Sequence, residues 1–234
     1  MKSKLIFMLL TLFTIVQVVG QKVKDSLASK FLWGITVAPG LSKINTEFID
    51  NPEITFYDYK NSFQFSSAIG LFLQKNLKNN ILLESGLLCS SIRGDESYNS
   101  KNGNKDTHTF VFFSKTTLKY IHLPFLIGYT YKNLNISGGV QIGYNISAYN
   151  EFNSSVHFNV SSGTKSSALF ERESDIDVLK YSFDGVLKLQ FNLGKGCLLG
   201  AKFYYQLTEE KNNFSRTKYF GTNLSVQYII NNKN

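Results

Sequence analysis

The sequence predicts an all-β protein: an eight-stranded antiparallel up-and-down transmembrane β-barrel of the outer-membrane type, preceded by a cleaved signal peptide. Three observations predict this fold. The 234-residue chain begins with a short apolar segment behind two lysines, later segments alternate apolar and polar residues, and the connections between those segments alternate between long and short. Together they indicate an exported chain that crosses a membrane with strands.

The N-terminus has the pattern of a secretory signal. Lys2 and Lys4 precede a run of about a dozen mostly apolar residues and a neutral cleavage region. This run is shorter than the roughly 20 residues that a spanning helix needs, so we favour a cleaved signal over an uncleaved anchor helix. We expect residues 1–20 to be removed and residues 21–234 to form a single outer-membrane β-barrel domain.

After the signal, no stretch approaches 18 consecutive apolar residues. A chain of this kind can span a bilayer only as a closed barrel, because every backbone polar group must be satisfied internally. Eight segments alternate, or nearly alternate, apolar and polar residues: 31–38, 63–74, 81–93, 117–131, 134–148, 181–191, 199–207 and 220–230.

The first four segments differ in how regular they are. Segments 31–38 and 63–74 carry most of their large apolar residues at odd positions, with small or polar residues between them. Segments 81–93 and 117–131 are less regular, because large apolar residues also stand on the nominally polar side. These are Leu82, Leu88, Ile92, Tyr120 and Leu126. We still predict strands there, since successive side chains of a strand point to opposite faces.

The fifth segment is the clearest. Residues 134–148 have apolar residues or glycine at even positions, and only Asn, Ser, Gly and Gln at odd positions. This length is long for a soluble strand and suits a tilted membrane strand with some overhang. Segments 181–191, 199–207 and 220–230 repeat the pattern.

The connections supply an independent test. Long connections are expected at 39–61, 94–116 and 150–177, short ones at 76–80, 132–133 and 194–196, and a medium one at 209–216. Outer-membrane barrels have short periplasmic turns and longer extracellular loops. The long connections are therefore predicted to lie outside the cell, with both termini in the periplasm.

Aromatic residues near the ends of the apolar faces predict two girdles at the membrane–water interfaces. The predicted membrane-interface aromatics are Trp33, Tyr129, Tyr131, Tyr181, Tyr205 and Tyr228. The alternative is that aromatics are simply common in strands.

Alternation alone does not say which face points inward. A lipocalin-like barrel would turn its apolar face to a ligand cavity and its polar face to water. Here the polar face is rich in Gly, Ser, Asn and Gln, and large aromatics crowd the other face. Because eight strands leave little interior volume, we predict a polar lumen and an apolar outer wall.

Charge and cysteine content exclude other classes. Without Lys2 and Lys4 the 25 basic residues become 23 against 17 acidic ones, a net charge of +6. The excess is spread along the chain, which argues against nucleic-acid binding and fits contact with outer-membrane lipid. Cys89 and Cys197 are too few for a disulfide framework, and we expect no bridge between them.

One segment resembles a known family. YIHLPFLIGY at 120–129 resembles the strand signature of the PorT-like outer-membrane β-barrel family of Bacteroidota, and GGVQIGY at 138–144 resembles that family's next segment. His122 stands where the family commonly has an acidic residue, and Cys89 where it has an aromatic one. Pro124 would remove a donor from the strand ladder. The resemblance implies an outer-membrane barrel, and one role in that family is support of a protein-secretion machine.

The predicted lumen carries a polar and charged cluster. Its members are Glu84, His122, Asp184, Lys188 and Lys202. If the turn at 194–196 sets the pairing, Lys202 lies diagonally across from Asp184, within reach of its long side chain. We expect these charges to pair and plug the lumen, because an isolated charge in a low-dielectric interior is unfavourable. The alternative is a gated polar path for small solutes.

Enzymatic and metal sites are not predicted. His108, His122 and His157 lack metal-ligand spacing, no cofactor motif is present, and we assign no catalytic residues. The sequence therefore predicts a non-enzymatic protein of the cell outer membrane whose long extracellular loops bind a ligand or dock another envelope protein. The alternatives are a narrow solute channel and a soluble periplasmic lipocalin-like carrier.

Overall fold

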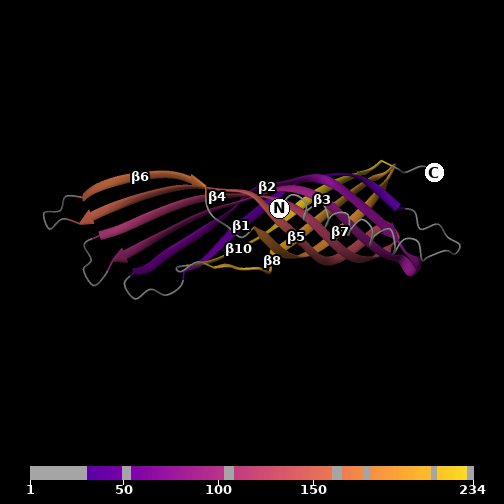
Figure 1. Ribbon diagram of the computed structural model, residues 1–234, viewed down its shortest axis with the longest axis horizontal. Helices are drawn as coiled ribbons and strands as arrows, with labels where there is room; N and C mark the ends of the chain where they lie inside the picture. Colours follow the sequence, from indigo (N-terminus) through magenta and orange to yellow (C-terminus); the bar gives the residue numbers. More distant parts are fainter. Residues whose placement is uncertain are drawn as a thin grey trace. The chain divides into compact units, whose positions relative to one another are not determined.

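The computed structural model describes six stretches of the chain: 31–48, 54–102, 108–159, 165–175, 180–211 and 215–230. The predicted signal peptide, residues 1–20, lies outside them. The elements in chain order are β1 (Phe31–Phe48), β2 (Ile54–Asn76), the 3-10 turn η1 (Lys78–Asn80), β3 (Ile81–Asn102), β4 (His108–Tyr131), β5 (Leu134–Asn159), β6 (Lys165–Asp175), β7 (Tyr181–Gly194), β8 (Cys197–Gln206), β9 (Glu210–Lys211) and β10 (Ser215–Ile229). Figure 1 shows how the strands are arranged. Within these stretches, no helix has the length and apolarity needed to cross a membrane.

Eight of the strands form a closed antiparallel ring in the order β1-β2-β3-β4-β5-β7-β8-β10, and β10 pairs back to β1. The closing ladder runs from Gly34 opposite Ile229 to Phe48 opposite Ser215. Closure leaves the ring without a free edge, which is the condition for a sheet to lie in hydrocarbon. The predicted eight-stranded barrel is confirmed.

One end of the ring is built from tight turns. Asn79, Asn80, Lys132 and Lys195 have positive φ angles between 51° and 62°, and Gly196 follows Lys195 with φ 78°. Two-residue hairpin turns require this left-handed conformation, because it matches the twist of the flanking strands. The short connections predicted at 76–80, 132–133 and 194–196 are therefore present.

At the other end, the prediction of long loops is wrong. Most of residues 39–61, 94–116 and 150–177 continue the strands: β1 extends to Phe48, β3 to Asn102, and β5 to Asn159, where it pairs with β6 and no longer with β7. In Figure 1 these strand ends project beyond the ring, toward the left. Apolar and polar residues do not alternate regularly along most of these segments, so the period-2 signal in the sequence is lost although the strands persist.

The two faces of the ring have opposite chemistry. Outward-facing Leu187, Val226 and Ile69 are 51%, 50% and 60% exposed, whereas inward-facing Gln141 and Asp184 are almost fully buried. A carrier that hides its apolar face would show the reverse. The apolar face is therefore the outer wall of the barrel.

The irregular strands 81–93 and 117–131 have a structural reason. Leu82, Leu88, Ile92, Tyr120 and Leu126 all point into the lumen and are buried. Most of them belong to an inner apolar cluster that also includes Ile44 and Tyr219. The interior is thus filled by apolar layers as well as polar ones.

Pro124 interrupts the β3–β4 ladder. Pairing is continuous up to Ser85 opposite Phe125 and resumes at Leu88 opposite His122 without a change of register. Proline has no N–H to donate, and the Ser85 hydroxyl instead donates to the Pro124 carbonyl at 2.9 Å. A side-chain hydrogen bond therefore bridges the strands where the backbone bond is lost.

Candidate functional site: the polar lumen

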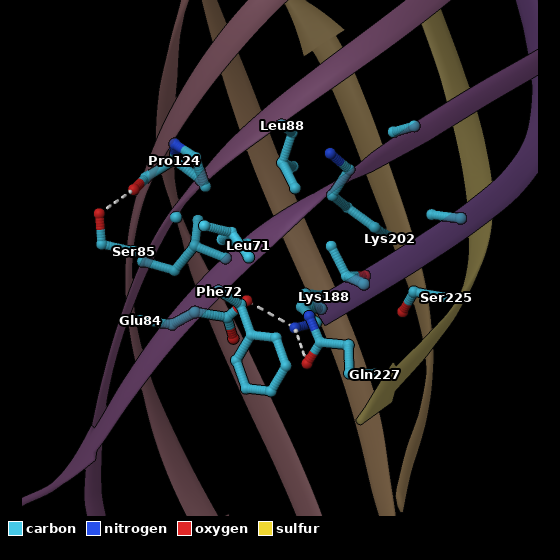
Figure 2. Close-up of a pocket in the computed structure, with 15 residues that line it drawn as sticks. Leu71, Phe72, Glu84, Ser85, Leu88, Pro124, Lys188, Lys202, Ser225 and Gln227 are labelled. Carbon is cyan, nitrogen blue, oxygen red and sulfur yellow. Dashed lines mark hydrogen bonds and ion pairs between the residues drawn. The ribbon is translucent and has the colours of Figure 1, made fainter. Parts of the chain in front are cut away.

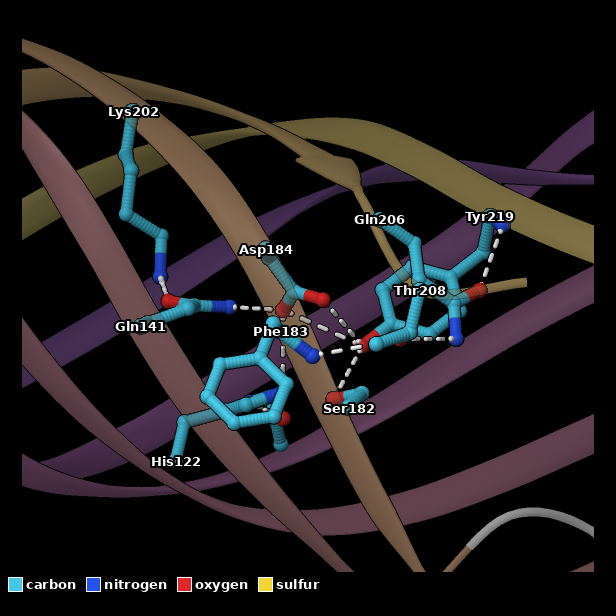
Figure 3. Close-up of polar contacts among 10 residues, drawn as sticks. His122, Gln141, Ser182, Phe183, Asp184, Lys202, Gln206, Thr208 and Tyr219 are labelled. Carbon is cyan, nitrogen blue, oxygen red and sulfur yellow. Dashed lines mark hydrogen bonds and ion pairs between the residues drawn. The ribbon is translucent and has the colours of Figure 1, made fainter. Parts of the chain in front are cut away.

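Asp184, on β7, is the centre of the first polar group in the lumen (Figure 3). Its carboxylate accepts hydrogen bonds from the Tyr219 hydroxyl at 2.8 Å and from Gln141 Nε2 at 2.6 Å. His122 Nε2 lies 3.4 Å from Asp184 Oδ2. Side chains of β4, β5, β7 and β10 thus converge on one buried carboxylate.

His122 is held on three sides. Its ring stacks on Tyr120 with centroids 5.2 Å apart, and its Nδ1 lies 2.6 Å from Ser90 Oγ. Gly143 faces it on β5, where an added Cβ would lie 2.7 Å from the His122 ring. Only glycine therefore leaves room for the imidazole at this level.

Ser90, His122 and Asp184 occur in the order of a nucleophile, a base and an orienting acid. The cavity beside Ser90 and His122 measures about 10 Å³. That volume is about what one water molecule needs. The arrangement therefore has no room for a substrate and acts as a packed hydrogen-bond network.

The second polar group lies nearer the turns (Figure 2). Lys188 Nζ donates to Glu84 Oε1 at 2.6 Å and to Gln227 Oε1 at 3.2 Å. Gln74 donates to Glu84 Oε2 at 3.0 Å, and Gln190 donates to Gln227. Glu84 and Lys188 thus form a buried ion pair whose remaining polar atoms are taken up by glutamines.

Lys202 lies between the two groups. The prediction that it lies diagonally across from Asp184 is wrong. The short β7–β8 turn places Lys202 opposite Lys188 and Asp184 opposite Gln206. Lys202 therefore reaches Asp184 only through Gln141, to which its Nζ donates at 3.2 Å. All five predicted lumen residues point inward and are buried.

The lumen is closed between its ends. The larger cavity measures about 30 Å³ and the smaller about 10 Å³. Phe72, Leu198 and Ile229 pack together nearer the turns, and the cluster of Ile44, Ile92 and Tyr219 lies on the other side. Side chains fill the described interior, which therefore holds a plug.

Sequence reasoning missed the neutral members of the network. Gln74, Gln141, Gln190 and Gln227 stand on the predicted polar faces, but they carry no charge and no motif. Tyr219 precedes the predicted eighth segment by one residue. The recurrence of glutamine on inward positions of four strands was the signal that could have found them.

A third polar group lies toward the end of the ring away from the tight turns. Exposed apolar side chains on β2 begin at Phe63, opposite Gly94, so Glu96 on β3 lies beyond them. Glu96 accepts hydrogen bonds from Tyr59 at 2.5 Å and from the Thr46 N–H and hydroxyl at 2.9 Å each. Burial raises the pKa of Glu96 above its usual range, and these hydrogen bonds partly oppose the rise.

The Tyr59→Phe variant is expected to raise the pKa of Glu96 further, because it removes the hydrogen bond that most favours the charged carboxylate. A carboxyl group with a raised pKa in the folded state stabilises the fold most at low pH. That contribution declines as the pH rises from the ordinary value of 4.5 through the raised pKa. Carboxyl ¹³C NMR titration, assigned with Glu96→Gln, measures the midpoint. An equal or lower midpoint in Tyr59→Phe would contradict the assignment.

The six predicted interface aromatics all point outward. Their exposed fractions lie between 43% for Trp33 and 60% for Tyr131. Across the described stretches, no group of three or more His, Cys, Asp or Glu side chains is placed to hold a metal ion. Cys89 and Cys197 are both free thiols, on β3 and β8.

Comparison with known proteins gives one family. The chain matches the outer membrane protein beta-barrel domain family over residues 20–212. No curated protein matches it.

Three solved structures show the range of similar folds. Neisserial surface protein A is 8% identical, with 84% of this chain and 96% of that chain covered and a TM-score of 0.36. OprG from Pseudomonas aeruginosa is 12% identical (89% and 96% covered, TM-score 0.32), and the protease OmpT from Escherichia coli is 8% identical (88% and 99% covered, TM-score 0.35). At these identities and scores, the likenesses carry no argument about activity.

Proposed function

Since this chain belongs to the outer membrane protein beta-barrel domain family, we propose that it is a non-enzymatic binding protein whose strand ends beyond the membrane contact a partner. The family places the chain in the outer membrane, where its barrel contacts lipid. The partner is an extracellular ligand or another envelope protein. The observation that carries the proposal is the contrast between a plugged lumen and strands that continue past the lipid-facing wall.

The projecting strands offer a surface of the right kind. Tyr98, Phe112 and Phe152 form a row across β3, β4 and β5, with ring centroids 4.9 Å and 5.6 Å apart. We call this the aromatic row. All three side chains are partly exposed, and aromatic side chains of this kind often anchor protein interfaces. On the opposite face of β4 and β5 from the aromatic row, Lys115 and Glu151 lie 3.8 Å apart and are about half exposed, as on a surface that faces water.

The same proposal covers the signal peptide, the outward aromatic residues and a role in secretion. Residues 1–20 act as a cleaved signal peptide, which the family match beginning at residue 20 supports. The six outward aromatics sit at the two membrane interfaces, which their exposure supports. A PorT-like role beside a secretion machine is supported by the segment resemblance at 120–129.

Photo-crosslinking in intact cells tests the binding role. A photoreactive residue at Phe152 is expected to yield one defined protein or glycan adduct, and the same residue at lipid-facing Leu187 is the control. Tyr98→Ala should reduce the adduct several-fold while the barrel keeps its heat-modifiable migration on a gel. Equal labelling at Phe152 and Leu187 would argue against the proposal.

Planar-bilayer recording separates this function from a narrow solute channel. The plugged lumen is expected to show no steady single-channel conductance, because apolar and ion-paired layers fill it. Steady conductance that changes in Lys202→Ala would favour the channel.

A further inference from the structure

The lipid-facing wall ends at a basic residue on β4. Its outward positions carry only aromatic or aliphatic residues from Tyr131 to Ile121, and the next outward residue is Lys119. At about 3.4 Å per residue and a tilt of about 40°, residues 121–131 rise about 26 Å, which matches the roughly 25 Å apolar band of such barrels. The tight turns of these barrels face the periplasm. Lys119 therefore lies at the level of the headgroups of the outer leaflet.

Arg93 of β3 lies beside Lys119 on the same outer face. Its neighbour Ile92 is buried in the lumen, so Arg93 points outward. Arg93 pairs with Thr117 in the β3–β4 ladder, and Lys119 is two residues further along β4. The two basic residues are therefore diagonal neighbours, whose Cβ atoms are typically about 7–8 Å apart or slightly less. Both side chains are exposed and long, so one group of phosphate size can contact both.

The charge around these two basic residues is not balanced on the lipid side. Within the described stretches, neither takes part in an ion pair. The nearby carboxylates are those of Asp95 and Glu151, which lie on either side of Lys115 in the next row of paired residues away from the lipid. The two rows nearer the lipid hold no carboxylate, and their other members on β3, β4 and β5 carry hydroxyl groups: Ser91, Ser147, Thr117 and Tyr149.

An apolar side chain of β5 lies at the same level. The β4–β5 ladder pairs Lys119 with Ser147 and Tyr120 with Asn145, so Ile146 is an extra residue in a β-bulge. Ile146 is 56% exposed. A lipid whose headgroup contacts Lys119 can therefore keep an acyl chain against the apolar wall.

We propose that Arg93 and Lys119 bind a phosphate group of an anionic lipid of the outer leaflet. Arginine presents a planar fork of donors that suits phosphate, and lysine adds a flexible point charge. Basic residues at an anionic membrane surface strengthen binding by about fivefold each. The site adjoins the lipid-facing wall, so a lipid gains apolar contacts there that a soluble anion lacks.

This site is independent of the proposed binding role. Tyr98 and Phe112 of the aromatic row lie on the opposite face of β3 and β4 from Arg93 and Lys119. Loss of lipid binding would leave the aromatic row intact, and a failure of the crosslinking experiment would leave the lipid site untouched.

Native mass spectrometry of the full barrel in detergent, titrated with lipid A, tests the proposal. The wild type is expected to bind phosphorylated lipid A roughly 25-fold more tightly than the same lipid after enzymatic dephosphorylation, because two basic residues contribute about fivefold each. Arg93→Gln and Lys119→Gln should each weaken binding of the phosphorylated lipid about fivefold, and the double variant should lose the preference. Lys132→Gln is the matched control, because it removes one exposed basic residue at the tight β4–β5 turn, and it should bind as the wild type does.

Inorganic phosphate is the second probe, and it separates a lipid site from a site for a free anion. Millimolar phosphate should not displace lipid A from the wild type. Heat-modifiable migration on a gel checks that each variant is folded, and the comparison of the two lipids on the wild type needs no variant. Equal affinity for the two lipids, an unchanged preference in the double variant, or full displacement by inorganic phosphate overturns the proposal.

Discussion

Lys188→Met is expected to lower the free energy of unfolding by about 3–5 kcal/mol, the usual effect of removing one partner from a buried ion pair. Lys188 donates to Glu84 at 2.6 Å, and both side chains are more than nine-tenths buried. Without the ammonium group, the Glu84 carboxylate remains in the lumen with only the Gln74 amide as a donor. Urea titration of the barrel in lipid vesicles, followed by tryptophan fluorescence of Trp33, measures the loss.

The double variant Glu84→Gln with Lys188→Met is the control for this pair. It removes both charges and keeps a polar side chain beside Gln74, so its stability should lie closer to the wild type than that of the single variant. Such non-additivity identifies a direct interaction. If the two substitutions destabilise the barrel additively, the two residues do not interact as described.

Leu187→Arg is expected to destabilise the membrane-embedded barrel by about 2–4 kcal/mol, the usual effect of a basic residue near the bilayer midplane. Leu187 is 51% exposed on the outer wall and lies midway along β7, opposite Gly138 and Phe203. A guanidinium group there would enter hydrocarbon without partners. Urea titration in vesicles measures the change.

Ser97→Arg is the matched control for the outer wall. Ser97 lies on β3 beyond the lipid-facing belt, opposite Phe113 of β4, where an added charge meets water. This variant should change the free energy of unfolding by less than about 0.5 kcal/mol, as is usual for surface sites. Equal losses in both variants would mean that the apolar wall does not face lipid.

The strands of the ring were predictable because lipid and lumen impose opposite chemistry on alternate residues. Segment 134–148 shows this clearly: Val140 faces out and Gln141 faces in. Farther along β3, Ser97, Tyr98 and Asn99 are all partly exposed, so the strand shows no comparable pattern there. The strand continues there because its backbone pairs with β4. Side-chain type gives no information about that pairing.

The charged lumen residues were predictable from the same alternation, but their partners were not. Glu84 and Lys188 are 104 positions apart, on β3 and β7, which are not adjacent strands. Their contact depends on how side chains cross the interior, and pairing of neighbouring strands gives no information about that. Likewise, the link from Lys202 to Asp184 passes through Gln141 of β5, a third strand.

The ladder between β1 and β10 joins the beginning of the described barrel to its end, from Gly34 opposite Ile229 onward. Until the final 15-residue strand has been delivered, both β1 and β8 have an edge of unpaired backbone groups that hydrocarbon cannot accommodate. A chain that lacks its C-terminal strand should therefore remain outside the bilayer, available to periplasmic chaperones and proteases. Delivery of β10 is thus itself the condition for insertion.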